Sequence, residues 1–369
     1  MKKLIIACFT VLSANSAQAQ ETGMKLWYDR PATQWVESLP LGNGRLGAMV
    51  YGDPIHEEFQ LNEETIWGGS PYNNTNPKAK EALPQIRQLI FEGRNKEAQA
   101  LCGPNICSQT ANGMPYQTVG SLHLDFEGIS SYSNYYRELD IEKAVTTTRF
   151  TAGGVTYTRE AFTSFPDQLL IIRLTASEKG KLSFTARYST PYQENITKSI
   201  SSRKELQMDG KANDHEGIEG KVQFTALTRI ERNGGHMESV SDTLLRVRNA
   251  NSVTIYVSIG TNFINYKDIS GNARKTAQTY LKNAGKNYLK AKEAHCATYG
   301  KWFNRVSLDL GSNAQAAKPT DVRVHEFASA FDPQLAALYF QFGRYLLICS
   351  SQPGGQKQYC TMVIYTDRP

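Results

Sequence analysis

Apolar and polar residues alternate along the middle of this chain, between residues 115 and 265. In SLHLDF, for example, Leu122, Leu124 and Phe126 fall on one face, as in a half-buried β-strand. Similar segments follow, with turn signals between them: VTTTRF, GVTYTREAF, QLLIIRLTA, KLSFTARYS, VQFTALTRI, TLLRVRN and SVTIYVSIG. Many short strands without intervening helices predict a mainly β fold, a large antiparallel β-sandwich. Residues 200–220 are polar and glycine-rich, so we expect an exposed loop or a ragged hairpin there.

Helical patterns lie on both sides of this region. Residues 24–70 fit short extended pieces, after which Asn76-Pro77 predicts the start of a helix. Its apolar residues recur at helical spacing: Leu83, Ile86, Leu89 and Ile90. A second helical piece, NKEAQAL, follows. After Asn262 the pattern is helical again, and LDLG then fits one last strand.

Two further helices are expected near the end of the sequence. The first begins at Thr320-Asp321, and the second, QLAALYFQFGRYLLICSS, begins at Asp332-Pro333. Arg344 is the only charged residue of the second helix, which is therefore apolar nearly all round. Such a helix is stable only when it is buried among other helices.

The composition is that of a globular protein, with 40% apolar and 21% charged residues in 369. The net charge is only +6, and the basic residues are interspersed with acidic ones. Nucleic acid is therefore not an expected partner.

The N-terminus, MKKLIIACFTVLSANSAQAQ, has the charged, apolar and A-x-A parts of a secretory signal. We expect cleavage after Ala19, export to a bacterial periplasm or the medium, and no membrane span in the mature chain. The cysteines that remain after cleavage are odd in number, which argues against a disulfide framework. Cys102 and Cys107 are close enough in sequence to bridge, and their pairing stays open.

Candidate chemistry concentrates in LPLGNGRLGAMVYGDPIHEEFQLNEETIWGGSP, residues 39–71. A tryptophan beside amide and charged side chains suits a sugar, whose apolar face packs on the indole while its hydroxyls form hydrogen bonds. The candidates for a surface that binds substrate, or that faces an adjoining domain, are Asn43, Arg45, Asn62, Glu63 and Trp67. The alternative is that the glutamates are solvated and Trp67 fills the sandwich core. Gly42, Gly44 and Gly47 have the spacing of a dinucleotide-binding fingerprint. The segment follows no long buried strand and opens no helix, so we do not expect it to bind a nucleotide.

No catalytic residue can be chosen from the pattern. Hydrolysis of a glycoside usually needs two carboxyl groups, and the chain has 35 acidic residues. Its six histidines show no HExxH or similar spacing, so we expect neither a metal site nor a cofactor. A G-x-S-x-G elbow is absent from the sequence.

Long motifs of this sequence resemble glycoside hydrolase family 95, which comprises α-L-fucosidases and some α-L-galactosidases. They are WYDRPATQWVESLPLGNGRLGAMVYGDPIHEEFQLNEETIWGGSP, MPYQTVGSLHLDF, YRELDIEKAV and DPQLAALYFQFGRYLLICSSQPGGQ. The resemblance implies an inverting mechanism, in which a glutamic acid protonates the leaving group and an aspartate, helped by asparagines, activates water. The implied partners are fucosylated or galactosylated glycans.

The resemblance also implies a domain order, consisting of a β-sandwich, a helical linker and an (α/α)6 catalytic barrel. The expected boundaries are a signal peptide at 1–19, a sandwich at 24–270, a linker at 271–319, the start of a barrel at 321–356 and a tail at 357–369.

The tail, KQYCTMVIYTDRP, resembles nothing in the family, whose catalytic residues follow the SQPGGQ segment. We therefore expect an incomplete barrel, a chain truncated before its catalytic residues, and no activity of the chain alone. The alternative is a non-catalytic carbohydrate-binding or domain-docking module. The pattern says nothing of the oligomeric state.

Overall fold

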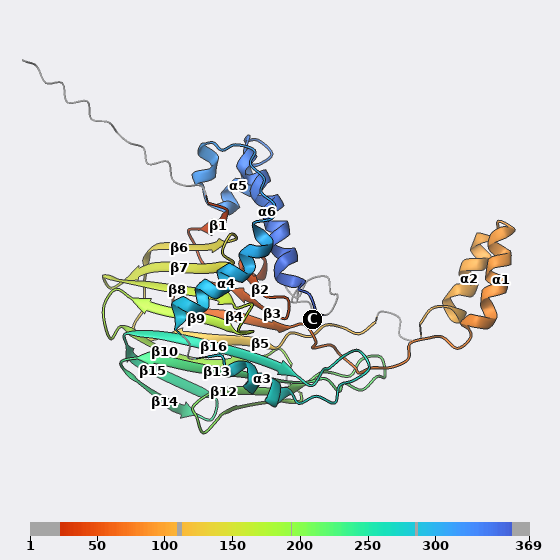
Figure 1. The fold of residues 1–369 in the computed structure, drawn as a ribbon, viewed down its shortest axis with the longest axis horizontal. Helices are drawn as coiled ribbons and strands as arrows, with labels where there is room; N and C mark the ends of the chain where they lie inside the picture. Colours follow the sequence, from red (N-terminus) through yellow and green to blue (C-terminus); the bar gives the residue numbers. More distant parts are fainter. Residues whose placement is uncertain (1–22, 109–112, 193, 285–286, 356–369) are drawn as a thin grey trace, which may run out of the picture.

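The computed structural model describes residues 23–108, 113–192, 194–284 and 287–355, in which strands form two large sheets (Figure 1). Every pairing between neighbouring strands is antiparallel. The predicted mainly β class is thus confirmed.

The larger sheet has nine strands. Their order across the sheet is β1 (Lys25–Tyr28), β6 (Ser133–Asp140), β7 (Val145–Ala152), β8 (Val155–Thr163), β9 (Leu170–Ala176), β16 (Ser252–Thr261), β13 (Gln223–Asn233), β12 (Leu206–Lys211) and β11 (Ile196–Ile200). The smaller sheet has seven strands. Their order is β14 (His236–Ser241), β15 (Leu244–Ala250), β10 (Leu182–Ser189), β5 (Gly120–Phe126), β4 (His56–Glu63), β3 (Leu46–Val50) and β2 (Leu39–Gly42).

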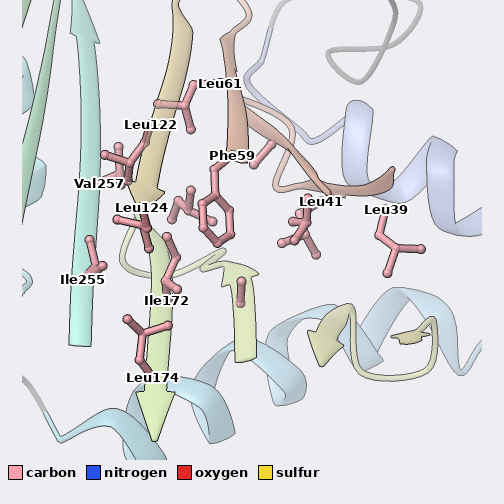
Figure 2. Packing of buried hydrophobic residues seen from close by; sticks show 14 of the residues in the cluster. Leu39, Leu41, Phe59, Leu61, Leu122, Leu124, Ile172, Leu174, Ile255 and Val257 are labelled. Carbon is pink, nitrogen blue, oxygen red and sulfur yellow. The ribbon is translucent and has the colours of Figure 1, made fainter. Parts of the chain in front are cut away.

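The main core lies between the two sheets. Leu122 and Leu124 of β5 point toward Ile255 of β16 and Ile172 of β9, and all four side chains are fully buried (Figure 2). Each such side chain stabilises the fold by about 1.5–3 kcal/mol relative to leaving it in water. The alternation in the sequence arises because every second side chain enters this core.

The polar region at 200–220 contains more regular structure than an exposed loop. The β11–β12 hairpin joins the edge of the nine-stranded sheet, and Leu206 and Met208 are buried beneath it. Of the two alternatives expected for residues 200–220, the hairpin is confirmed. An exposed loop is wrong for residues 206–211, which form β12. The expected strand at LDLG is absent, because residues 308–311 adopt no regular structure.

Two helices cover the outer face of the nine-stranded sheet. In α3 (Ala273–Leu281) and α4 (Tyr288–Phe303), small and apolar side chains pack on Phe162 and Tyr256 of the sheet. The short 3-10 helices η1 (Trp35–Glu37) and η2 (Ala314–Ala317) lie in the connections.

Helices α1 (Ala79–Phe91) and α2 (Asn95–Asn105) form a hairpin that stands apart from the sandwich (Figure 1). Its small core contains Ile86, Leu89 and Ala98. Helix α1 begins later than Asn76-Pro77 predicts, because Asn76 Oδ1 accepts the Lys78 amide (3.1 Å) in a turn before it. Cys102 and Cys107 are both free thiols in this structure.

The last two helices are α5 (Thr320–Glu326) and α6 (Pro333–Ser350). Asp332 caps α6 by accepting the Leu335 amide (3.0 Å), and its carboxylate forms a buried, two-bond ion pair with Arg323 of α5. One face of α6 packs on the sandwich, whereas Tyr339 and Leu347 on another face are 78% and 65% exposed. No helix in the described part of the chain has the length and apolarity that a membrane crossing needs.

Candidate functional site

The tip of the β2–β3 hairpin carries the first candidate, Asn43, which is buried. Its side-chain oxygen accepts the amides of Arg45 (3.1 Å) and Leu46 (2.8 Å), and its Nδ2 donates to the Ser164 carbonyl (2.8 Å). An asparagine that satisfies its own turn in this way is typical of tight connections. Asn43 therefore shapes the hairpin and joins it to the loop after β8.

Arg45 bridges three parts of the fold. Its guanidinium donates to the Gln168 side chain (2.9 Å) and carbonyl (3.0 Å) and to the Ile259 carbonyl (2.7 Å). It also lies 3.4 Å from a Glu63 carboxylate oxygen and stacks on the Tyr280 ring, 4.2 Å from its centroid. These contacts connect the hairpin with the nine-stranded sheet and with α3.

Glu63, at the end of β4, is buried rather than solvated. Its Oε2 accepts the Thr65 amide (2.8 Å) and hydroxyl (2.6 Å), and that hydroxyl lies 2.6 Å from the Thr261 hydroxyl. Asn62 is buried beside it and opposite Gly47 of β3. The expectation that the glutamates are solvated is wrong, because Arg45 and these donors replace water around the Glu63 carboxylate.

Trp67 is half-buried, so it neither fills the core nor stands free. Its indole meets the Tyr116 ring edge-on at 5.4 Å, and its Nε1 donates to the Glu64 carbonyl (3.0 Å). Burial and the neighbouring Glu63 raise the pKa of Tyr116, whose neutral hydroxyl donates to the Glu63 carbonyl (2.9 Å). Part of the indole surface stays accessible to a ligand.

The hairpin tip contacts the C-terminal end of α6. The Gly44 amide donates to the Cys349 carbonyl (2.7 Å), and a Cβ placed on Gly42 would lie 2.5 Å from that carbonyl oxygen. About one turn earlier in α6, the Tyr345 hydroxyl donates to the Pro40 carbonyl (2.6 Å). The glycines therefore allow the close approach of a helix.

A cluster of edge-on and tilted aromatic rings continues this contact into α4. Tyr345 meets Tyr299 at 6.2 Å, and Tyr299 in turn lies 5.9 Å from Phe165. His295 of α4 is fully buried in the same cluster, with its ring centroid 4.7 Å from that of Phe162. Its Nε2 lies 3.0 Å from the Lys143 carbonyl, and burial lowers the pKa of His295 to about 4. The ring is therefore neutral at pH 7, with its proton on Nε2.

A small polar pocket of about 180 Å³ lies beside the hairpin. Arg45, Glu63 and Glu64 contribute to its lining, together with Thr261 and Gly354, which follows α6. Since Arg45 and Glu63 are already paired with each other and with neighbouring groups, the pocket offers few uncommitted polar atoms. Of the predicted residues, the structure thus brings four together, while Trp67 lies next to them through Glu64.

Sequence reasoning missed the partners of these residues. Ser164, Gln168, Thr261, Tyr280 and Cys349 hold the candidates in place, yet they are far from residues 39–71 along the chain. No local motif marks them, because their roles depend on the packing of β8, β16, α3 and α6. In the described part of the chain, His, Cys, Asp and Glu side chains form no group of three suited to a metal.

Two family models match the sequence. The model of "Glycosyl hydrolase family 65, N-terminal domain" matches residues 26–266, and that of "Glycosyl hydrolase family 95 catalytic domain" matches residues 287–359. The first match covers most of both sheets, and the second begins just before α4. The hairpin–α6 contact therefore lies between the two matched segments.

Curated relatives carry fucosidase names. The chain is 33% identical to Alpha-L-fucosidase 2 of Arabidopsis thaliana, over 90% of this chain and 43% of the relative. It is 30% identical to "Probable alpha-fucosidase A" of Aspergillus niger, over 89% of this chain and 43% of that one. The chain thus spans less than half the length of these relatives. Among solved structures, one assigned as a kojibiose phosphorylase from the human microbiome superposes with a TM-score of 0.48 at 10% identity, covering 89% of this chain and 42% of that one.

Proposed function

We propose that this chain, which belongs to the family 95 type of glycoside hydrolases and represents their N-terminal portion, is part of an α-L-fucosidase. The enzyme would remove terminal α-L-fucosyl groups from glycans with inversion, and α-L-galactosyl groups are the alternative substrate. The role of this portion is to hold α6, which lies in the segment matched by the catalytic-domain model, in a fixed position.

The observation that carries this role is the contact of the β2–β3 hairpin with α6. The hairpin lies in the segment that matches the family 65 N-terminal domain, and α6 lies in the segment that matches the family 95 catalytic domain. The Gly44–Cys349 and Tyr345–Pro40 hydrogen bonds therefore fix the position at which the chain leaves α6. Positioning of this kind matters because the rate of an enzyme falls when its catalytic groups are displaced by about 1 Å.

We further propose that these 369 residues do not release fucose by themselves. In the family, the general acid and the water-activating aspartate follow the SQPGGQ segment, so no residue of this chain is assigned to either role. The proposed activity needs the longer polypeptide found in the relatives.

An activity assay tests both parts. The purified 369-residue chain is incubated with a fucosylated oligosaccharide, an aryl α-L-fucoside and an aryl α-L-galactoside, and the released sugar is quantified. We expect no release. Turnover that copurifies with the chain through several columns would contradict the assignment of catalysis to the longer polypeptide.

The longer polypeptide provides the positive arm. Reading the gene downstream of codon 356 in all three frames shows whether family 95 sequence continues there. An extended chain obtained in this way is expected to release fucose. An extended chain that folds but hydrolyses neither fucoside nor galactoside would refute the proposed substrate class.

The second candidate function is a carbohydrate-binding or docking module, and the geometry favours docking. The polar groups of Asn43, Arg45 and Glu63 are used within the protein, so they serve the domain interface. Calorimetric titration with neutral fucosylated oligosaccharides is expected to show no heat of binding at this surface. Saturable binding that is lost on Trp67→Ala would favour the sugar-binding alternative.

Export is part of the proposal. Residues 1–19, which have the features of a secretory signal, and the tail from residue 357 lie outside the described residues. Mass spectrometry of the mature protein from its native host tests this step. We expect an N-terminus at Gln20 and recovery in the periplasm or the medium.

A further inference from the structure

A polar groove lies on the outer face of the nine-stranded sheet, where α3 lies against β12 and β13. It consists of two adjoining pockets of about 470 and 380 Å³, and Arg274 at the start of α3 lines both. Many of the residues that line it belong to β12, β13 and α3, which lie next to one another in the fold (Figure 1). Together the pockets are large enough for an oligomeric ligand.

Positive charge predominates in this groove. Its basic side chains are Arg203, Lys211, Arg229, Arg274 and Lys282, and its acidic side chains are Glu205 and Asp209. The two carboxylates are already paired, Glu205 with Arg229 (2.7 Å) and Asp209 with Arg274 (3.0 Å). Lys211 is paired with Glu219, outside this lining (3.7 Å), and the remaining basic side chains leave a surplus of positive charge.

Arg203 and Lys282 supply much of this surplus. Both side chains are exposed, and neither forms an ion pair with a carboxylate in the described part of the chain. Arg203 lies in the β11–β12 turn, and Lys282 follows α3, so two separate elements bring them to the same pocket. Cations placed on both walls of a concave site attract an anion more strongly than isolated surface charges do.

The remaining lining suits hydroxyl groups. Gln207, Gln278, Ser201 and Ser202 line the second pocket, while Asn195 and Thr197 line the first. Two of these side chains also bond within the protein, Ser201 to the Glu205 amide and Gln207 to Asp209. These groups both donate and accept hydrogen bonds. The lining includes one aromatic residue, Phe224, which is only 3% exposed and offers no stacking surface. A neutral sugar would therefore lack the ring contact that usually holds it.

We propose that this groove binds an anionic glycan, an oligosaccharide that carries sulfate or carboxylate groups. Arg203 and Lys282 would receive the anionic groups, since guanidinium and ammonium groups form charge-assisted hydrogen bonds with such oxygens. The amides and hydroxyls of the lining would bind the sugar hydroxyls. The choice of a glycan as the carrier of the charge rests on the proposed function, whereas the binding of anions rests on the groove alone.

Calorimetric titration of the 369-residue chain at low ionic strength tests the proposal. The probes are a sulfated fuco-oligosaccharide, a uronate-containing oligosaccharide, a neutral fuco-oligosaccharide of equal length and inorganic sulfate. We expect saturable binding of the two charged oligosaccharides, weakened by added salt, and much weaker binding of the other two. Equal affinity for the neutral oligosaccharide would overturn the role of charge. Equal affinity for inorganic sulfate would overturn the assignment to a glycan.

Matched variants locate the site. Arg203→Ala combined with Lys282→Ala is expected to weaken binding of the charged oligosaccharides about tenfold or more. Arg87→Ala combined with Lys96→Ala removes the same number of positive charges from the exposed α1–α2 hairpin, and we expect it to change the affinity little. If both double variants bind alike, the groove is not the site. Because no fucose release is measured, this result is independent of the activity assay for the proposed function.

Discussion

At the scale of single residues, the candidate residues act mainly by binding other parts of the protein. Arg45 shows this most clearly, because one guanidinium serves Gln168, Ile259, Glu63 and the Tyr280 ring. A guanidinium is planar and donates in several fixed directions, which a lysine ammonium cannot reproduce. The residue type at position 45 is therefore explained by structure, without a ligand.

Arg45→Lys keeps the charge and removes most of these bonds. We expect the free energy of unfolding to fall by about 2–3 kcal/mol, since buried acceptors lose their donors. Urea unfolding followed by tryptophan fluorescence measures this loss. The control is Arg149→Lys on the exposed side of β7, which should change stability by less than about 0.5 kcal/mol. Equal stabilities for the two variants would contradict this account of Arg45.

At the scale of elements, the fit of the β2–β3 hairpin against α6 is set by glycine. Gly42 has no side chain where the Cys349 carbonyl approaches, so even a methyl group there forces the helix to move. By contrast, Gly343 in the middle of α6 is exposed and has open space around its Cα. One glycine inside the contact and one outside it therefore have opposite expected responses to alanine.

Gly42→Ala is expected to destabilise the protein by about 1–3 kcal/mol and to loosen α6. Gly343→Ala is expected to stabilise it by about 0.5–1 kcal/mol through helix propensity. Cys349 is a natural probe, because its thiol is buried and burial also raises its pKa. Thiol alkylation followed by peptide mass spectrometry should show faster labelling of Cys349 in Gly42→Ala only. Slow labelling in both variants would mean that the hairpin does not hold the helix.

The sequence pattern predicted elements with a strong local signal and missed those without one. Strand β16 was evident because SVTIYVSIG is apolar and rich in β-branched residues. Strand β12, LQMDGK, was obscured by polar and glycine residues, although Leu206 and Met208 alternate in it and are buried. The Gly42–Cys349 contact could not be predicted from spacing, since residues more than 300 positions apart share no local pattern.

At the scale of the whole molecule, α4 joins the sandwich to α6, and His295 lies buried in the joint. Its pKa of about 4 is below the ordinary value near 6.5 because burial disfavours the charged ring. The unfolded chain therefore binds a proton more readily than the folded one. Folding stability that depends on neutral His295 is complete above about pH 6.5 and is lost as the pH falls toward 4.

We expect this single group to lower the free energy of unfolding by about 3 kcal/mol between pH 7 and pH 4. Urea unfolding at several pH values measures the slope. In His295→Gln, the amide keeps a donor but does not titrate, so the acid slope should be shallower by about that amount. Burial raises the pKa of Glu57, which contributes in the opposite direction in both proteins and cancels in the comparison. Parallel slopes would contradict the role of His295.

The distance along the chain between the β2–β3 hairpin and α6 has a consequence for biosynthesis. Pro40 and Tyr345, which share a hydrogen bond, are separated by 305 residues. At roughly 5–20 residues per second, about 15–60 s pass between the synthesis of one and the other. During that interval the hairpin tip has no helix to pack against. The tip consists of Gly42, Asn43 and Gly44, which expose little apolar surface to other nascent chains. A partly synthesised chain therefore has little tendency to aggregate through this surface.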